Sequence, residues 1–191
     1  MTVRLGSRNP LVVVTGGHDA GKSFFCMRVL RAAQRRGMSV GGVITHKLIV
    51  EGEEVRYVED IGSGEYRLLY RCRPEAGPSH RQPSPETVRW AQASLESAAD
   101  RDLLVLDELG PLELYSGGGW DNSLRLLERR AARLTLVVVA DGLLGRFHAE
   151  VAHREMSLVE LSTDTREESL VAMLAWLPSY SRGVRPGAIA A

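Results

Sequence analysis

Short apolar runs alternate with longer helical patterns along most of the chain. Residues 11–14, 103–106 and 136–139 are rich in valine and leucine and have the length of buried strands. Residues 22–36 instead carry apolar side chains at helical spacing and end at Gly37, which favours a helix closed by a glycine. A strand, a glycine-rich turn and a helix in this order are typical of the start of a parallel α/β sheet.

The later part of the chain continues this alternation. Ser84 and Pro85 are typical of an N-cap followed by proline in the first helical turn. Thr165 and Glu168 fit a capping box before the last helix, and the last strand is predicted over 158–161. Helices are predicted where apolar residues recur at helical spacing, over 85–98, 124–134, 143–151 and 165–177. The alternation predicts a three-layer α/β fold with a mainly parallel sheet.

The segment from about 40 to 72 departs from this pattern. Strand-like runs over 39–50, 54–61 and 65–72 are separated only by short, glycine-containing turns. Short connections without helices predict an antiparallel hairpin or meander, inserted into the main sheet or added at its edge. We therefore expect a single domain over 1–178 with an antiparallel insert at about 40–72, followed by a loose tail over 179–191.

The bulk composition limits the classes of partner. The 24 basic side chains equal the 24 acidic ones, so no net field is expected to attract nucleic acid or a membrane surface. The two cysteines, Cys26 and Cys72, have no metal-ligand spacing and cannot form a framework of disulfides. The apolar run at 11–14 is far shorter than a signal peptide or a membrane span, so a cytoplasmic location is expected. A protein partner is possible, and nothing in the sequence identifies one.

Residues 16–23 read GGHDAGKS, which fits the pattern of a phosphate-binding loop, the Walker A motif. In such a loop successive backbone N–H groups point at phosphate, and the following helix turns its positive end toward the same anion. Lys22 is predicted to reach the β and γ phosphates, and the Ser23 hydroxyl to bind Mg²⁺. The predicted nucleotide-binding residues are Gly16, Gly17, His18, Asp19, Ala20, Gly21, Lys22, Ser23 and Phe24.

A carboxylate at position 19 is unexpected in a loop that binds a polyanion. Because the backbone does the binding, a side chain at a variable position can point away into water. The dipole of the following helix also favours a carboxylate near its N-terminus by about 0.3–1 kcal/mol. Asp19 is therefore compatible with phosphate binding, and His18 either lies near a phosphate or is simply solvated.

The second motif is LLVLDELGPLEL at 103–114, an apolar strand that ends in an acidic pair. This arrangement fits a Walker B motif, in which Asp107 holds Mg²⁺ near Ser23. Glu108 is then placed to orient the water that attacks the γ phosphate, or to accept its proton. An acidic pair at a strand end can also merely face solvent. The order of the two motifs along the chain favours the catalytic interpretation.

The stretch DELGPLEL makes the chain similar to a family of small bacterial and archaeal P-loop nucleoside-triphosphatases, the thermophilic or cancer-related NTPase family. The resemblance covers roughly residues 10–175 and includes GGVITHK, VEDIGSGE and STDTREESL. It implies a P-loop NTPase fold and Mg²⁺-dependent hydrolysis of nucleoside triphosphates to diphosphate and phosphate, with little base preference. The residues to which this role carries over are Gly16, Gly21, Lys22, Ser23, Asp107 and Glu108.

The sequence departs from the family pattern at two places. The family's loop commonly continues Gly-Lys-Thr-Thr-Leu, whereas this chain has Gly-Lys-Ser-Phe-Phe, which still supplies a hydroxyl for Mg²⁺. Thr165 stands where the family has an asparagine, which leaves the role of Arg166 open. The sequence also identifies no arginine finger, so a partner would supply one or turnover would be slow.

Three functions follow from these motifs. The leading hypothesis is a Mg²⁺-dependent nucleoside-triphosphatase with Lys22 and Glu108 as catalytic residues and Ser23 and Asp107 as metal ligands. The second is a nucleotide-binding adapter or switch, since molybdenum-cofactor adapter proteins are similar in their small P-loop architecture. The third is a small-molecule kinase or ligase, because the loop containing Asp19 faintly resembles that of dethiobiotin synthetase.

Overall fold

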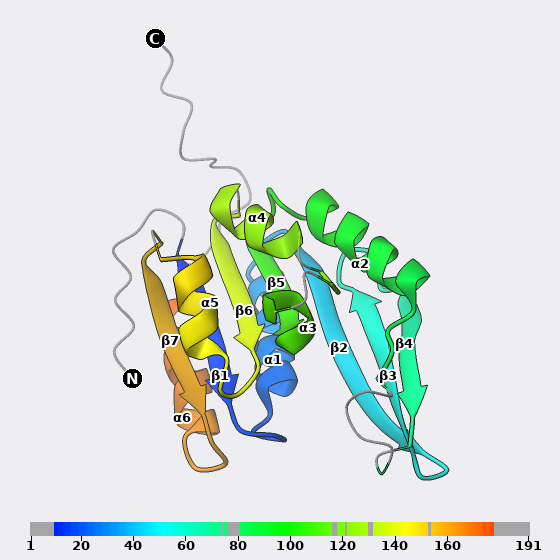
Figure 1. Ribbon diagram of the computed structural model, residues 1–191. Helices are drawn as coiled ribbons and strands as arrows, with labels where there is room; N and C mark the ends of the chain where they lie inside the picture. Colours follow the sequence, from blue (N-terminus) through cyan, green and yellow to red (C-terminus); the bar gives the residue numbers. More distant parts are fainter. Residues whose placement is uncertain are drawn as a thin grey trace.

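The computed structural model describes residues 10–73, 75, 81–115, 118–120, 122–129, 132–152 and 154–177. Within these ranges seven strands form one sheet in the order β4-β3-β2-β5-β6-β1-β7 (Figure 1). The strands are β1 (Leu11–Gly16), β2 (Val40–Val50), β3 (Glu53–Asp60), β4 (Tyr66–Cys72), β5 (Leu103–Leu109), β6 (Leu134–Val139) and β7 (Met156–Leu161). The helices are α1 (Lys22–Arg35), α2 (Pro85–Ser97), α3 (Pro111–Tyr115), α4 (Asn122–Arg129), α5 (Leu144–Glu150) and α6 (Arg166–Trp176).

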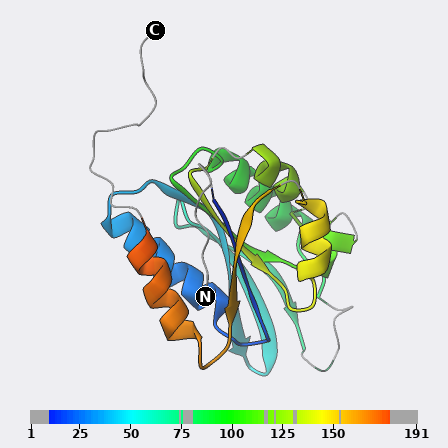
Figure 2. The same ribbon diagram turned by 90° about the vertical axis from the view of Figure 1, so that its left-hand side faces the viewer.

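Helices cover both faces of the sheet, so the molecule has three layers. Figure 2 shows α1 and α6 on one face and α2, α4 and α5 on the other. Successive side chains of a strand point to opposite faces, and β1 shows the consequence directly. Val12 and Val14 pack in the core half with α1 and α6, while Leu11 and Val13 pack in the half with α2 and α5. The predicted α/β fold with a mainly parallel sheet is confirmed.

The antiparallel segment continues the main sheet at one edge. Residues Val40 to Val43 of β2 pair in parallel with β5, and residues Val43 to Val50 pair antiparallel with β3. Strand β4 adds to β3, also antiparallel, and forms the sheet edge. The predicted division into a domain over 1–178 with an insert at 40–72 stays a prediction, and the tail from residue 179 lies outside the described residues.

One predicted helix has wrong bounds, and one short helix was not predicted. The helix predicted over 124–134 is α4, which covers Asn122–Arg129, and Leu134 instead begins β6. Leu134 keeps helical spacing with Leu127, but it pairs in parallel with Leu103 of β5 and is buried there. Burial in the sheet therefore outweighs the helical pattern. The short helix α3 was not predicted, because five residues are too few to show a period.

The two helix caps predicted at N-termini have different outcomes. Ser84 does cap α2, since its hydroxyl accepts a hydrogen bond from the Thr87 backbone at 3.3 Å. Thr165 makes no side-chain cap bond to α6, so the predicted capping box with Glu168 is wrong. Instead Ser162 and Thr165 exchange two bonds: the Thr165 N–H donates to Ser162 Oγ at 3.2 Å, and the Ser162 N–H to Thr165 Oγ1 at 3.0 Å. The reciprocal pair therefore lies three residues earlier than predicted.

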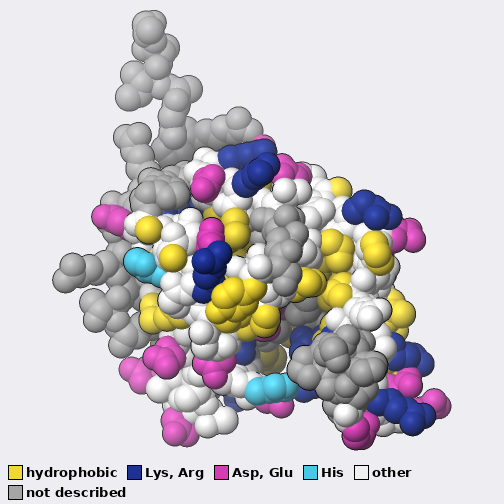
Figure 3. All heavy atoms as spheres, viewed as in Figure 1, with side chains coloured by type: hydrophobic (Ala, Val, Ile, Leu, Met, Phe, Trp, Pro, Cys, Tyr) yellow, Lys and Arg dark blue, Asp and Glu magenta, His cyan; other side chains and the backbone are white. Residues whose placement is uncertain are grey.

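The surface agrees with the balanced composition. On the face shown in Figure 3, Lys and Arg side chains lie among Asp and Glu side chains and do not gather into one basic patch. In the part of the chain that the structure describes, no helix is both long and apolar enough to cross a bilayer. Both cysteines are free and buried, as expected for thiols that form no disulfide framework.

Gly42 provides a test of how tightly the sheet is packed. It has φ +111°, and a Cβ atom there would lie 1.9 Å from the Val105 carbonyl oxygen of β5. We expect Gly42→Ala to lower the free energy of unfolding by about 3–5 kcal/mol, because the backbones of β2 and β5 would have to separate. Gly52→Ala is the matched control: Gly52 has φ +79° and open space around it, so only about 1–2 kcal/mol of backbone strain is expected. Equal losses in chemical denaturation would contradict this packing.

Candidate functional site

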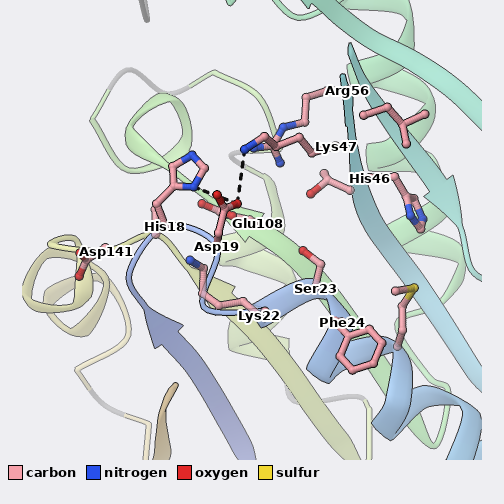
Figure 4. Close-up of a pocket in the computed structure, with 15 residues that line it drawn as sticks. His18, Asp19, Lys22, Ser23, Phe24, His46, Lys47, Arg56, Glu108 and Asp141 are labelled. Atoms are coloured by element: carbon pink, nitrogen blue, oxygen red, sulfur yellow. Dashed lines mark hydrogen bonds and ion pairs between the residues drawn. The ribbon is translucent and has the colours of Figure 1, made fainter. Parts of the chain in front are cut away.

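The functional candidates meet in a cleft at one edge of the sheet. Strands β1, β5 and β6 run parallel, so their carboxyl ends lie at the same edge, where ligands of open α/β sheets bind. A cleft of about 490 Å³ opens there. One wall is the loop 17–21 with the start of α1, the other is the hairpin strands β2 and β3, and Glu108 lies between them (Figure 4).

The loop after β1, residues 17–21, contains a residue in the left-handed conformation. Asp19 has φ +58°, a left-handed conformation that aspartate adopts more readily than most residues. The Lys22 ammonium donates to the carbonyl oxygens of Gly16 at 2.8 Å and Gly17 at 3.1 Å, which keeps the cation at the mouth of the loop. Ala20 is buried in the core below the loop, so this residue can contribute to binding only through its backbone.

Gly21 and Arg166 are in direct contact, although they are far apart in sequence. Gly21 has φ +87°, and a Cβ atom there would lie 2.7 Å from a terminal nitrogen of Arg166. The guanidinium of Arg166 also lies 6.0 Å from the centre of the exposed Phe24 ring. The structure thus places Arg166 against the predicted phosphate loop, even though Thr165 replaces the family's asparagine.

Asp107 is fully buried below the cleft floor. The Thr45 backbone N–H donates to its Oδ2 at 3.3 Å, while Oδ1 has no partner among the described residues. Burial and the nearby charge of Glu108 raise the pKa of Asp107 to about 7, although the nearby Ser23 hydroxyl and the Thr45 N–H act to lower it. An unpaired buried oxygen close to the Ser23 hydroxyl fits a divalent cation, whose preferred ligands are oxygens.

No cluster of three or more His, Cys, Asp or Glu that could hold a metal by itself occurs among the residues the structure describes. A Walker-type site does not need such a cluster, because a hydroxyl and a single carboxylate hold the ion together with the nucleotide phosphates. Ser23 and Asp107 are the residues that would hold such an ion.

Glu108 faces the cleft and is held through its backbone. The regular pairing of β5 with β6 shifts between Leu106 and Leu109, so the acidic pair lies in an irregular part of the strand, as is common beside functional sites. The Trp120 indole N–H donates to the Glu108 carbonyl at 3.0 Å. The buried Glu113 side chain accepts from the Gly110 N–H at 2.8 Å and closes the turn after the strand. These contacts fix the backbone that carries Glu108.

The carboxylate of Asp19 has two neighbouring side chains, Lys47 and His18. Its Oδ1 lies 3.4 Å from the Lys47 ammonium of β2 and 3.0 Å from His18 Nδ1 (Figure 4). Slight burial would raise the pKa of Asp19, but Lys47 and His18 outweigh it and lower that pKa. The prediction that Asp19 points into water is therefore only partly right, because the side chain is exposed but also bridges the cleft mouth.

The structure brings the predicted residues together and adds a wall that the motifs did not show. His18, Asp19, Gly21, Lys22, Ser23, Phe24 and Glu108 line the cleft, with Asp107 buried just below. The added wall consists of Thr45, His46, Lys47, Leu48 and Arg56 of the hairpin strands. One signal was present in the sequence: the chain has only two lysines, and both line this cleft.

The fold and the two motifs define the class of protein as a P-loop NTPase, and comparisons with known proteins place it further. A sequence profile of the NTPase family, described as NTPase, matches residues 11–174. The chain therefore belongs to this family, and it is an enzyme of the nucleoside-triphosphatase class. P-loop NTPases generally use a divalent metal, and the Ser23 hydroxyl and the Asp107 carboxylate are oxygen groups of the kind that could hold one.

Individual relatives agree with this assignment. The chain is 25% identical over 162 residues to the nucleoside-triphosphatase THEP1 of Thermofilum pendens, a match that covers 81% of this chain and 88% of that protein. It is 26% identical to the corresponding protein of Ignicoccus hospitalis, over 89% of this chain and 98% of that one. The solution structure of a human cancer-related nucleoside triphosphatase superposes on this chain with a TM-score of 0.67 at 18% sequence identity. The superposition covers 91% of this chain and all of that one, so the two proteins share a fold.

The contribution of the Asp19–Lys47 ion pair to the free energy of unfolding can be tested directly. Asp19 is 78% exposed, so the pair is screened by water and is expected to contribute little to stability. We expect Asp19→Asn, which tolerates the same left-handed backbone, to change the free energy of unfolding by no more than about 0.5 kcal/mol. A loss above about 1 kcal/mol in thermal or chemical unfolding would instead show that the pair anchors the loop to β2.

Proposed function

We propose that this chain hydrolyses nucleoside triphosphates to diphosphate and phosphate in a Mg²⁺-dependent reaction with broad base tolerance. The observation that supports this most strongly is that one cleft combines Lys22 of the loop, Glu108, and the unpaired carboxylate oxygen of Asp107 just below. The matching NTPase profile and the names of the relatives point to the same reaction.

Each residue has a separate task in this proposal. The loop backbone and Lys22 would neutralise charge on the β and γ phosphates, and Ser23 and Asp107 would hold Mg²⁺. Bound Mg²⁺ would withdraw charge from the phosphate oxygens. Glu108 would orient the attacking water and accept its proton as the bond between the γ phosphorus and its bridging oxygen breaks. Because these contacts are directed at phosphates, the proposal includes little preference for the base.

The roles of the two motifs can be separated by substitution. We expect Glu108→Gln to keep nucleotide binding and to lower turnover on the order of 10²–10⁴-fold, because an amide cannot accept the proton. Lys22→Ala should instead weaken nucleotide binding as well. The measurement is phosphate release from ATP, GTP, CTP and UTP with Mg²⁺, beside direct nucleotide-binding titrations. Near-native turnover of Glu108→Gln would remove this residue from the mechanism.

The outcome with the native chain decides between the functions. Phosphate release from several nucleotides supports a broad triphosphatase. Binding without any release would favour a nucleotide-dependent adapter or switch, for which a stable protein partner should co-purify. Release only after addition of a small-molecule acceptor would favour a kinase.

The metal site has its own test at Ser23. We expect Ser23→Ala to raise the Mg²⁺ concentration needed for half-maximal phosphate release by about tenfold or more, because the hydroxyl ligand is lost. Ser23→Thr is the matched control, since it keeps the hydroxyl and should remain within about threefold of the native chain. Chelation of the metal should stop release in the native chain, and added Mg²⁺ should restore it. Equal Mg²⁺ dependence of the two variants would exclude Ser23 as a ligand.

A further inference from the structure

Two cations lie directly opposite each other on the hairpin wall of the cleft. In the antiparallel register of β2 and β3, Lys47 pairs with Arg56, and both side chains line the cleft. Figure 4 shows both extending from the hairpin toward the side of the cleft that holds the loop and Glu108. Like charges directly opposite on neighbouring strands are destabilising. An arrangement that costs stability and points into a cleft is typical of a site for an anion.

Each of these two cations has one carboxylate neighbour: Lys47 lies 3.4 Å from Asp19, and Arg56 bonds to Glu54. Arg56 Nε donates to Oε1 of Glu54, two residues earlier on β3, at 3.2 Å. Glu54 is buried and also accepts from the Tyr70 hydroxyl at 2.8 Å and from Arg81 at 3.3 Å. Glu54 thus has three donors to share its charge, and its bond to Arg56 uses only Nε. Among the residues that the structure describes, none bonds to the two terminal nitrogens of Arg56, which are left to contact a ligand.

Arg56 also lies near the reacting end of the site. Burial alone would lower its pKa, but Tyr70, Glu54 and Glu108 outweigh burial and raise it. The charge of Arg56 in turn acts on Asp107. Arg56 therefore lies on the hairpin side of Glu108, whereas Lys22 approaches from the loop side, and all three line the cleft.

We propose that Arg56 is a catalytic residue that binds the γ-phosphoryl group and serves as an arginine finger supplied by the chain itself, with Glu54 as its positioning residue. The inference rests on the proposed hydrolysis. A water oxygen forms a bond to the γ phosphorus while the bond to the bridging oxygen breaks. The electron pair of that bond stays on the diphosphate, and Glu108 accepts the water proton. Arg56 donates hydrogen bonds to the γ-phosphate oxygens during this step, where negative charge is spread most widely.

Kinetics of Arg56→Gln test the proposal. We expect kcat to fall on the order of 10²-fold or more, while the affinity for the diphosphate product with Mg²⁺ stays within about threefold, because Arg56 contacts only the γ group. Arg71→Gln is the matched control: Arg71 lies on β4, is half exposed and pairs with Glu53 at 3.4 Å, so its loss should leave kcat unchanged. An unchanged kcat of Arg56→Gln overturns the proposal, and so does a loss of diphosphate affinity as large as the loss of kcat.

A conservative variant covers the case in which Arg56→Gln does not fold. Arg56→Lys keeps the charge but loses the planar fork of donors, so we expect a kcat reduction on the order of tenfold. A kcat within twofold of the native value would overturn the role of the guanidinium. The native chain is measured first: if it releases no phosphate, the proposed function itself fails, whereas native release that persists in both variants overturns only the role of Arg56.

The role of Glu54 has a separate readout. If Glu54 acts only through Arg56, Glu54→Gln should lower kcat on the order of tenfold, and the double variant with Arg56→Gln should be no slower than Arg56→Gln alone. Additive losses in this double-mutant cycle would show that Glu54 does not act through Arg56.

Discussion

Both faces of the central strands must be buried at once, and this constraint determines where the functional groups lie. Strands β1, β5 and β6 are apolar on both sides, so helices have to cover both faces of the sheet. Polar groups can then gather only where these strands end. The loop 17–21 leaves the end of β1, and Asp107 and Glu108 lie near the end of β5. Burial of apolar side chains thus assembles an edge rich in charge.

Asp107 shows what this arrangement costs. A carboxylate that is fully buried with one unpaired oxygen is unfavourable unless an ion or a hydrogen-bond donor satisfies it. The hairpin wall carries a similar cost, since Lys47 and Arg56 face each other across β2 and β3. A magnesium ion and a triphosphate bound in the cleft would relieve both. The negative charge of Asp107 below the floor is complementary to the metal ion, and the positive charges of Lys47 and Arg56 on the hairpin wall are complementary to the phosphates.

The sequence predicted those parts of the site that are contiguous in the chain. Residues 16–24 form one motif between a strand and a helix, and Asp107 and Glu108 follow a recognisable apolar run. Arg56 could not be found in this way, because its place opposite Lys47 depends on the register of two antiparallel strands, which no motif specifies. Leu134 was misassigned for a related reason, since its pairing with Leu103 is a long-range contact. That Lys22 and Lys47 both line one cleft was hinted at only by the scarcity of lysine in the sequence.

The most direct test is an experimental structure of the chain with Mg²⁺, ADP and aluminium fluoride, which imitates the γ-phosphoryl group during transfer. We expect the ADP phosphates in the loop 16–23, the metal beside Ser23 and Asp107, and the fluoride within hydrogen-bond distance of both Lys22 and Arg56. Binding of the nucleotide outside this cleft would contradict the proposed function. Binding in the loop with Arg56 turned away from the fluoride would contradict the catalytic role of Arg56.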